Sequence, residues 1–396
     1  MEHNKLIFSK VPTLRFSQYH SDWTRCSLSD IANVVGGGTP DTADETLWNG
    51  DIQWFTPTEV GHSKYVSKSI RTISQSGLKK SSAKILPNGS VLLSSRATVG
   101  ECSIAKIDCT TNQGFQSLIP KNNVNNEFLY YLAQTKKRHF IKYASGSTFL
   151  EISNSEIKKT KCFVPRIEEQ TKIAEFLSLI DRKLEVQNKI ISKYETLIKG
   201  LSCDYFSKQP NHIAKLKDLI IKGKAGGTPS STIAEYYNGN IPFLSISDMT
   251  RQGKYVEFTE KHISENGLAN SSAWIVPSNS LILSMYASVG LVCINKVPLA
   301  TSQAMFSMVL KDCNMLDYIY YYLNFFRETQ IHRLLETGTQ SNINADTVRD
   351  IEIPFYSNIL VFVKTLQAIE NRLNNEKDML SRLMDLKTYL LSSLFI

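Results

Sequence analysis

The sequence has few features that would place the chain in a membrane or outside the cell. No apolar run approaches the ~20 residues needed to cross a bilayer. The first twenty residues carry His3, Lys5, Lys10 and Arg15 without the apolar stretch of a secretory signal. The seven cysteines are odd in number and include no CxxC pair, which argues against a disulfide framework or a structural zinc site. These absences predict a cytoplasmic globular protein.

Several motifs of catalysis are also missing. The chain has no GxxxxGK(S/T) phosphate loop, no GxGxxG dinucleotide motif, no HExxH, and no Asn-Pro-Pro or Asp-Pro-Pro sequence of the adenine methyltransferase kind. His62 and His139 have no cysteine or acid at ligand spacing. Ser94, Ser95 and Ser284 lie outside a GxSxG context. We therefore expect no ATP hydrolysis, no metal site and no nucleophilic serine.

The chain does contain a tandem repeat of about half its length. Gly37-Gly38-Thr39-Pro40 returns as Gly226-Gly227-Thr228-Pro229, and Ser81-Ser82-Ala83 returns as Ser271-Ser272-Ala273. Further pairs follow in the same order, with drifts of one or two residues. Because order and spacing are both kept, the repeat indicates a duplication. Two similar halves in one chain suit a target with two parts, and DNA is the commonest such target.

The charge of the chain favours a polyanion as partner. The 396 residues carry a net charge of +8, with a pI near 8.9. Lysine and arginine gather at three places in the first half, where they are suited to neutralise phosphates. The alternative is that each cluster is a solvated surface. The clusters are Lys79-Lys80 with Lys84, Lys136-Lys137-Arg138-His139 with Lys142, and Lys158-Lys159-Lys161.

Each half reads as a mixed α/β domain followed by a long helix. Residues 90–93 and 280–283 read as buried strands, and 127–132 and 317–323 as amphipathic helices. After each domain, apolar residues alternate at spacings of three and four, as in the seam of a coiled coil. The seam positions are Ile173, Leu177, Ile180, Leu184, Gln187, Ile191, Tyr194, Ile198 and Leu201 in the first half, and Leu366, Ile369, Leu373, Glu376, Leu380, Leu383, Lys387, Leu390 and Leu394 in the second.

The duplication predicts how these two helices pair. A pseudo-two-fold axis across the seam makes them antiparallel. The polar seam residue Gln187 corresponds to Glu376, and both lie near mid-helix. We expect them to hydrogen-bond and fix the register, the alternative being two independent polar residues. A helix of about 33 residues is ~50 Å long, whereas half-sites one turn of duplex apart are separated by ~34 Å.

The predicted fold class is α+β: two tandem α/β domains separated by two long helices that pack as a pseudo-symmetric antiparallel coiled coil. The expected boundaries are 1–165 and 208–354 for the domains, and 166–207 and 355–396 for the helical regions.

Short motifs at the ends of these parts resemble the specificity (S) subunit of type I restriction-modification systems. They are Val11-Pro12-Thr13-Leu14-Arg15-Phe16 with Trp23, Leu28, Asp30-Ile31 and Gly37-Gly38-Thr39-Pro40; Gly146-Ser147-Thr148-Phe149 with Ile152-Ser153, Ile157, Val164-Pro165 and Glu169-Gln170; and Leu390-Leu391-Ser392-Ser393-Leu394-Phe395. The resemblance covers nearly the whole chain.

The resemblance implies that each domain reads one half of a split, asymmetric DNA site. It also implies that the helices bind two modification subunits, which transfer a methyl group from S-adenosylmethionine to adenine N6. Restriction subunits that cleave DNA with ATP and Mg are possible further partners. The specificity subunit itself is expected to carry no cofactor and no catalysis.

One departure separates the halves. Glu169-Gln170 lies in the first turn of the first helix, where an acid is favourable. The second half has Asn358-Ile359 near that place and lacks the pair. The change of Gly146-Ser147-Thr148 to Gly338-Thr339-Gln340 is milder. The lost pair puts in question whether the second helix starts and engages its partner in the same way.

Specificity is expected where the two halves differ. Arg96 stands opposite Tyr286 in the repeat, the first suited to a guanine edge or phosphate and the second to stacking or a phosphate. The alternatives are a surface arginine and a half-buried core tyrosine. Gln113 and Gln303 are shared, and we interpret them as scaffold or phosphate contacts. The DNA-contact candidates are Lys79, Lys80, Arg96, Gln113, Lys136, Lys137, Arg138, Tyr286 and Gln303.

The two long helices end in equivalent apolar and aromatic residues. Tyr205-Phe206 and Leu394-Phe395 end equivalent helices and are candidate contacts for the modification subunits, or else caps on the neighbouring domain.

The rival hypothesis for the function is a duplicated-domain enzyme, such as a nuclease or a carbohydrate-active protein. It would need a repeated acidic cluster. Glu59 and Asp248 are equivalent acids and Glu45 lies near, but no second equivalent acid pair joins them.

Overall fold

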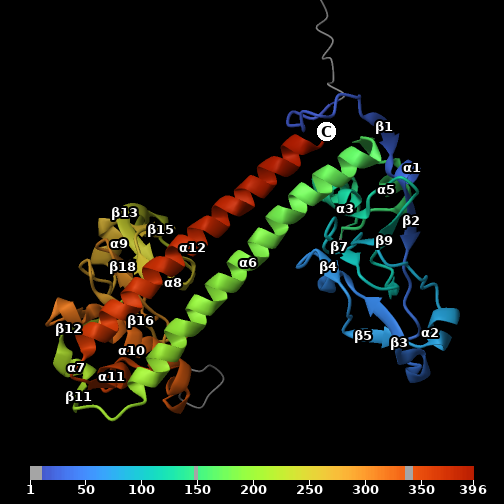
Figure 1. Cartoon of the computed structure of the whole chain (residues 1–396). Helices are drawn as coiled ribbons and strands as arrows, with labels where there is room; N and C mark the ends of the chain where they lie inside the picture. The colour runs from blue at the N-terminus through green and yellow to red at the C-terminus, as the bar shows by residue number, and fades with distance from the viewer. Residues whose placement is uncertain (1–10, 147–149, 335–341) are drawn as a thin grey trace, which may run out of the picture. The chain divides into compact units, whose positions relative to one another are not determined.

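The computed structural model describes residues 11–146, 150–334 and 342–396, which divide into two compact units. The first unit joins the chain up to Lys189 with Lys377–Ile396, and the second is Ile190–Glu376. Each unit therefore holds one α/β module and one segment of each of two long helices, α6 (Ile167–Phe206) and α12 (Ile359–Leu394) (Figure 1). Within the described residues, no helix has the length and apolarity to cross a membrane.

The first module is built on two sheets and a ribbon. A central strand, β6 (Val91–Leu93), pairs antiparallel with a neighbour on each side and is fully buried, as its apolar sequence predicts. The five-stranded sheet runs β2 (Ala32–Gly36), β9 (Gln116–Pro120), β6, β7 (Cys102–Ala105), β4 (Tyr65–Val66); the three-stranded sheet runs β5 (Arg71–Ile73), β3 (Trp48–Phe55), β8 (Cys109–Thr111); the ribbon pairs β1 (Thr24–Ser27) with β10 (Lys161–Val164).

Short helices cover the first module. The longest, α3 (Asn126–Thr135), packs on β6 and β7, and the side chain of Asn125 caps it by accepting from the Phe128 amide. This helix confirms the amphipathic helix that the sequence predicts over residues 127–132. The others are α1 (Leu28–Ile31), α2 (Gln75–Lys79), α4 (Lys137–Tyr143) and α5 (Asn154–Lys159), with the 3-10 turns η1 (Glu45–Leu47) and η2 (Pro57–Glu59).

The second module repeats this topology strand for strand. Its sheets run β12 (Ile220–Ala225), β19 (Met305–Leu310), β16 (Leu281–Ser284), β17 (Val292–Asn295), β14 (Tyr255–Val256) and β15 (Lys261–Ile263), β13 (Tyr237–Leu244), β18 (Ala300–Thr301), with the ribbon β11 (His212–Lys215) and β20 (Glu352–Phe355). Its helical elements are α7 (Leu216–Leu219), α8 (Ile246–Gln252), α9 (Glu265–Ala269), α10 (Leu316–Thr329) and α11 (Ala345–Arg349), with η3 (Ala234–Tyr236), η4 (Cys313–Met315) and η5 (Ile331–Arg333).

The duplication extends to the backbone at tight places. A Cβ on Gly37 would lie 2.1 Å from the Asn112 carbonyl oxygen, and one on Gly226 would lie 2.0 Å from the Thr301 carbonyl oxygen, so neither position accepts a side chain. Ala97 and Ala287 both adopt left-handed φ angles, of 61° and 58°. The repeated glycine turn is therefore structural in both modules.

The two long helices run antiparallel within each unit. In the first unit, Asp181 of α6 pairs with Lys387 of α12 at 2.7 Å. In the second unit, Tyr205 near the end of α6 stacks on Phe362 near the start of α12, with ring centroids 3.8 Å apart. All eighteen predicted seam positions are buried or half-buried. The mixed α/β modules and the long helices confirm the predicted fold class.

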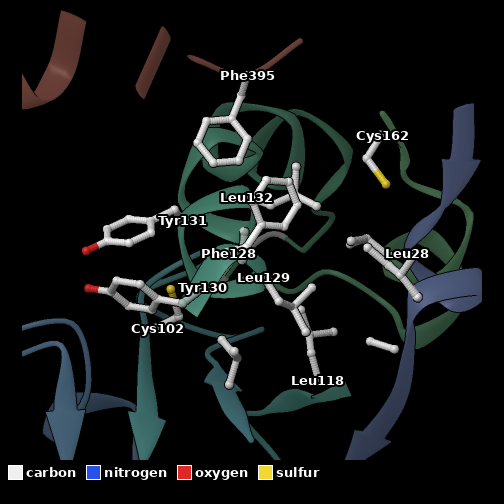
Figure 2. Close-up of a cluster of buried hydrophobic side chains, with 14 of the residues drawn as sticks. Leu28, Cys102, Leu118, Phe128, Leu129, Tyr130, Tyr131, Leu132, Cys162 and Phe395 are labelled. Atoms are coloured by element: carbon white, nitrogen blue, oxygen red, sulfur yellow. The ribbon is translucent and has the colours of Figure 1, made fainter. Parts of the chain in front are cut away.

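The C-terminal end of α12 completes the core of the first unit. Phe395 packs 5.2 Å, centroid to centroid, from Phe128 of α3 (Figure 2). Its ring centroid also lies 6.4 Å from that of Trp23. Leu390 and Leu394 join the same cluster as Ile173 and Leu177 of α6. This single core, shared by module and helices, holds the module on its helical support.

Candidate nucleic-acid interface and its helical support

A loop after β6 presents the first candidate for base contact. The Ser94 hydroxyl donates to the Arg96 carbonyl at 3.0 Å, and the Ser95 amide donates to the Gly114 carbonyl at 2.8 Å. The Arg96 side chain is 45% exposed and lies 3.5 Å from the Glu151 carboxylate. Left-handed Ala97 follows it, and such strain in a non-glycine residue persists only where the surroundings impose it. The loop therefore holds Arg96 at the surface on a fixed backbone.

The second module builds the same loop around a different side chain. The Ser284 hydroxyl donates to the Tyr286 carbonyl at 2.7 Å, and the Met285 amide donates to the Ala304 carbonyl at 2.8 Å. Tyr286 is 41% exposed and precedes left-handed Ala287. One scaffold thus carries an arginine in one module and a tyrosine in the other.

The shared glutamines lie beside the glycine turns. The Thr39 hydroxyl donates to Gln113 Oε1, and the Thr228 hydroxyl donates to Gln303 Oε1. Both glutamines are exposed. Because Oε1 is engaged by threonine in both copies, each amide nitrogen is oriented as the donor that remains for a phosphate or a base acceptor.

The basic candidates of the first module lie on different elements and differ in exposure. Lys79 and Lys80 are exposed at the end of α2, and Arg138 is exposed on α4. Lys137 is paired with Glu101 at 2.5 Å. Lys136 donates to the Ile396 carbonyl at 2.9 Å, and burial lowers its pKa. This placement favours a structural role for Lys136 over a phosphate contact.

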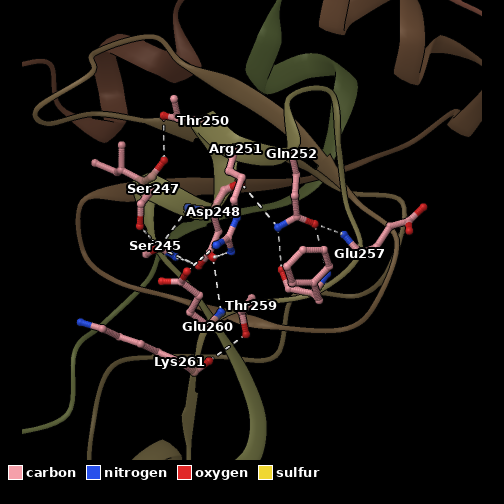
Figure 3. A network of polar contacts seen from close by, with 12 residues as sticks. Ser245, Ser247, Asp248, Thr250, Arg251, Gln252, Glu257, Thr259, Glu260 and Lys261 are labelled. Carbon is pink, nitrogen blue, oxygen red and sulfur yellow. Dashed lines mark hydrogen bonds and ion pairs between the residues drawn. The ribbon is translucent and has the colours of Figure 1, made fainter. Parts of the chain in front are cut away.

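The equivalent acids Glu59 and Asp248 serve as helix caps. Asp248 is fully buried and accepts from the Ser245 amide and hydroxyl and from Arg251, as Figure 3 shows. Glu59 accepts from the Thr56 amide and hydroxyl in the same way. These are the reciprocal bonds of a capping box. The acids that a duplicated enzyme would have used for catalysis are therefore occupied by local structure.

A buried lysine joins the first module to α6. Lys64 Nζ lies 2.8 Å from Glu127 of α3 and also donates to Ser178 of α6. Tyr131 donates to Asp181 of α6 at 2.5 Å, and Asp181 in turn pairs with Lys387. Burial lowers the pKa of Lys64 and outweighs its pairing with Glu127. The network ties β4, α3 and both long helices together.

The second module repeats this network with a different charge balance. Lys254 lies 2.7 Å from Glu370 of α12 and 2.8 Å from Asp317 of α10, and Tyr321 donates to Glu370 at 2.5 Å. Burial alone would lower the pKa of Lys254, but the two carboxylates outweigh it and raise that pKa. We call the two networks, centred on Lys64 and Lys254, the docking networks.

The docking networks do have a signal in the sequence, because their residues are repeated. Lys64-Tyr65 returns as Lys254-Tyr255, and Glu127 and Tyr131 return as Asp317 and Tyr321. A lysine next to tyrosine reads as surface in isolation. Its repetition beside repeated acids is what indicates a buried role.

The Glu169-Gln170 pair fastens the start of α6. Glu169 is buried, accepts from Arg15 at 2.7 Å and from the Trp23 indole at 3.2 Å, and so anchors the segment before β1. Gln170 donates to the Pro165 carbonyl at 2.9 Å and accepts from the Asn125 amide.

The start of α12 is held by other contacts. The Tyr356 hydroxyl donates to the carbonyls of Phe206 and Lys208, and Gln367 donates to Asp317 at 2.6 Å. The second helix therefore begins without the Glu-Gln pair, and an aromatic residue takes over the anchoring.

The aromatic helix ends are buried within their own units. Tyr205 and Phe206 belong to the core of the second unit, and Leu394 and Phe395 to that of the first. This placement favours capping over direct contact with another subunit. Gln187 is buried and Glu376 half-buried, and their mutual hydrogen bond stays a prediction.

One predicted motif lies outside the residues that the structure describes. The boundary motif Ser147-Thr148-Phe149 and its counterpart Gly338-Thr339-Gln340 lie outside them. Within the part of the chain that the structure describes, no three His, Cys, Asp or Glu side chains cluster as a metal site would require.

Together these features define a class: a tandem pair of α/β modules, each with an equivalent loop surface and each docked on long antiparallel helices. The sequence matches the type I restriction modification DNA specificity domain over residues 20–196 and 210–377, and the chain belongs to that family. The resemblance stated from the sequence motifs is thereby confirmed.

Individual relatives agree with this assignment. The chain is 35% identical over 253 residues to the type I restriction enzyme MjaIX specificity subunit of Methanocaldococcus jannaschii, covering 58% of this chain and 59% of that protein. It is 26% identical over 216 residues to the EcoR124I/EcoR124II specificity subunit of Escherichia coli, covering 50% and 53%. The matched part thus spans between half and three fifths of these relatives.

Two solved structures share the fold. The S subunit of a type I restriction-modification system from M. genitalium superposes with a TM-score of 0.57 at 15% identity, covering 98% of this chain and 99% of that one. A chain from a study of complex assembly and conformational transition in the type I R-M system gives 0.61 at 14% identity, covering 94% and 97%.

Proposed function

We propose that this chain is the DNA-recognition subunit of a type I restriction-modification complex and that each module reads one half of a bipartite, asymmetric site. The observation that carries the proposal is the loop built twice on one scaffold, with Arg96 in one module and Tyr286 in the other. The two modules share the loop backbone but carry different side chains on it, which suits the reading of two different half-sites. Membership of the DNA specificity domain family supports the same conclusion.

The chemistry of the two loops fits duplex DNA. A guanidinium donates two parallel hydrogen bonds to guanine O6 and N7, and a tyrosine contacts phosphate or stacks on an exposed base. The oriented amides of Gln113 and Gln303 add a donor beside each loop. Lys79, Lys80 and Arg138 supply charge for phosphates, and the net charge of +8 adds long-range attraction.

The long helices also offer a surface for partner subunits. In the first unit, Leu179 and Val186 of α6 are exposed at a spacing of seven, as are Met379 and Leu386 of α12, with Tyr389 one turn on. A heptad spacing keeps each pair on one face of its own helix, outside the seam positions themselves, and we call these five residues the exposed stripe. This exposed stripe replaces Tyr205, Phe206, Leu394 and Phe395 as the proposed contact for the modification subunits.

The complex we propose contains two modification subunits and, in a full system, restriction subunits, acting in the cytoplasm. S-adenosylmethionine, ATP and Mg belong to those partners, and this chain contributes recognition without catalysis. Methylation of adenine N6 at both half-sites would follow.

The test is a methylome of a host carrying this gene and its modification gene, compared with the same host after deletion of this gene. We expect one split motif of N6-methyladenine to vanish on deletion. A host carrying Arg96→Gln should lose or change only one half of the motif, whereas exposed Arg138→Gln on α4 should keep both halves. An unchanged methylome after deletion, with the modification protein present, would refute the proposed function.

A further inference from the structure

Two cysteines face each other across the ribbon that closes the first module. Cys26 of β1 and Cys162 of β10 are direct partners in the antiparallel register, and their Sγ atoms lie 3.5 Å apart. The residues stand 136 positions apart in the chain, one before the sheets of the module and one after them. The duplicated sequence gives no reason for this pair, because neither cysteine is repeated.

The backbone spacing at this pair suits a disulfide. The Leu28 amide donates to the Thr160 carbonyl at 3.0 Å, two residues beyond the cysteines on both strands. Because hydrogen-bonded pairs alternate along an antiparallel ladder, Cys26 and Cys162 also form such a pair, with Cα atoms about 5.5 Å apart. That separation lies inside the usual range for disulfides, about 4.4–6.8 Å.

The two sulfurs differ in access. Cys26 is half-buried and reachable from solvent, whereas Cys162 is buried at the edge of the core beside Leu28 (Figure 2). The contact with the Cys162 sulfur lowers the pKa of Cys26, against the effect of burial. In contrast, burial raises the pKa of Cys102, Cys109 and Cys293, which face apolar cores. Cys26 is therefore placed to be oxidised first, and Cys162 is placed to react with the oxidised sulfur.

The second module supplies a natural comparison. Its ribbon has the same register, and the pair at the place of Cys26 and Cys162 is Ala214 and Ile353. The fold therefore accepts an apolar pair at this position without loss of the ribbon. A thiol pair is not needed for packing, which leaves its chemistry as the distinguishing property.

We propose that Cys26 and Cys162 are a reversible oxidation site, in which a peroxide converts the facing thiols to a disulfide that fastens β1 to β10. The Cys26 thiolate attacks one peroxide oxygen, which forms a sulfenic acid and releases hydroxide. The Cys162 thiol then attacks the sulfenic sulfur, which forms the S–S bond and breaks the S–O bond, and the hydroxyl leaves as water with the Cys162 proton. The hydroxide from the first step takes up the proton that Cys26 lost and gives the second water. Two thiols and one hydrogen peroxide thus give one disulfide and two waters.

The disulfide would close a loop that contains nearly all of the first module. A crosslink between distant residues restricts the unfolded chain most when the loop is long. Oxidation is therefore expected to stabilise the first module selectively, because the Ala214 and Ile353 pair gives the second module no such bond.

The test uses the full chain with the exposed cysteines removed by Cys203→Ser and Cys313→Ser, which prevents crosslinks between molecules. The protein is treated with near-stoichiometric hydrogen peroxide, alkylated under denaturing conditions without reductant, digested and analysed by mass spectrometry. We expect a peptide pair joined through Cys26 and Cys162 in most chains, lost again on treatment with dithiothreitol.

Two variants make the test specific. C26A/C162I copies the second module and should give no crosslink and no change in unfolding temperature on oxidation, whereas the parent should gain several degrees. C26S keeps nearly the native volume and should leave Cys162 fully alkylated. Overoxidation of Cys26 with Cys162 still alkylated would overturn the proposal, as would an unreacted pair. A crosslink with no rise in unfolding temperature would overturn the stabilising effect.

Discussion

Lys254 Nζ lies 2.7 Å from Glu370 Oε2, in a contact where the lysine side chain is 10% exposed and the carboxylate 20%. Tyr321 donates to the same oxygen, and Asp317 Oδ1 lies 2.8 Å from the same ammonium. Removal of one partner from a buried ion pair of this kind is strongly destabilising, because it leaves an uncompensated charge. The second module is thus fastened to α12 by one cation with several acceptors.

Removal of this cation should destabilise the second unit. Lys254→Met leaves Glu370 and Asp317 as uncompensated carboxylates in a largely buried site, and we expect a loss of about 3–5 kcal/mol in the free energy of unfolding. Exposed Lys261→Met on β15 is the matched control and should change it by less than about 0.5 kcal/mol. Chemical denaturation measures both. Equal effects in the two variants would contradict the buried role of Lys254.

Two aromatic residues at the end of α12 should separate stability from assembly. Phe395 is 6% exposed in the core, so Phe395→Ala should cost about 3–5 kcal/mol of stability. Tyr389 is 60% exposed, so Tyr389→Ala should leave stability nearly unchanged and weaken binding of the modification subunit. Thermal unfolding and titration with purified modification subunit measure the two effects. A Tyr389→Ala chain that binds as the parent does would argue against the exposed stripe.

The strained loop of the second module should respond to glycine. Ala287 has φ of 58°, where a Cβ costs about 1–2 kcal/mol. Ala287→Gly should therefore raise stability by about 1 kcal/mol, while the looser loop weakens selection at its half-site. Ala269→Gly at the exposed end of α9 should change stability in the opposite direction, by about 0.5–1 kcal/mol. Denaturant titration checks the opposite signs.

Arg96 should set preference at one base pair. Arg96→Gln removes the bidentate donor and should lower affinity of the assembled complex for its site by about 10–100-fold, the range of one good base contact. Arg138→Gln should reduce affinity less and equally for all sequences, because a phosphate contact carries no sequence information. Competition binding against single-base variants of the site distinguishes these outcomes. A uniform loss for Arg96→Gln would assign it to phosphate.

Acid should loosen the docking networks. Burial alone would raise the pKa of Glu127, but hydrogen bonds from Lys64, Ser178 and Tyr65 outweigh it and hold that pKa below its ordinary value of 4.5. Since the folded-state pKa is depressed, the stabilising contribution is present above that value and is lost as pH falls through the folded pKa. Thermal unfolding from pH 7 to pH ~3 should show a steep loss at the acidic end. Glu127→Gln should flatten this slope, and exposed Glu175→Gln should leave it unchanged.

The fold followed from the sequence because its signals were periodic or repeated. The three-four spacing of Ile173 to Leu201 is a property of the helix itself, and the buried strand at Val91–Leu93 is a short apolar run between turns. Both signals act locally and need no knowledge of the partner. The duplication then extended each element of one half to the other.

The contacts between distant segments did not follow from the sequence. Lys136 lies among basic residues and reads as a phosphate contact, yet it donates to the carbonyl of Ile396. Lys64 and Glu127 are 63 positions apart, and only the packing of α3 on the sheet brings them together. Charge patterns report composition, whereas burial of a charge depends on which segments meet in space.

In each module the strand that begins it pairs with the strand that ends it, β1 with β10 and β11 with β20. Because these two strands lie side by side, the chain enters and leaves the module at neighbouring points. A residue inserted into or deleted from the module therefore need not move the strands that begin and end it. Such length changes leave the heptad seam of α6 and α12 untouched. The exposed loops that follow β6 and β16 can therefore change in length or sequence while the two long helices keep their register.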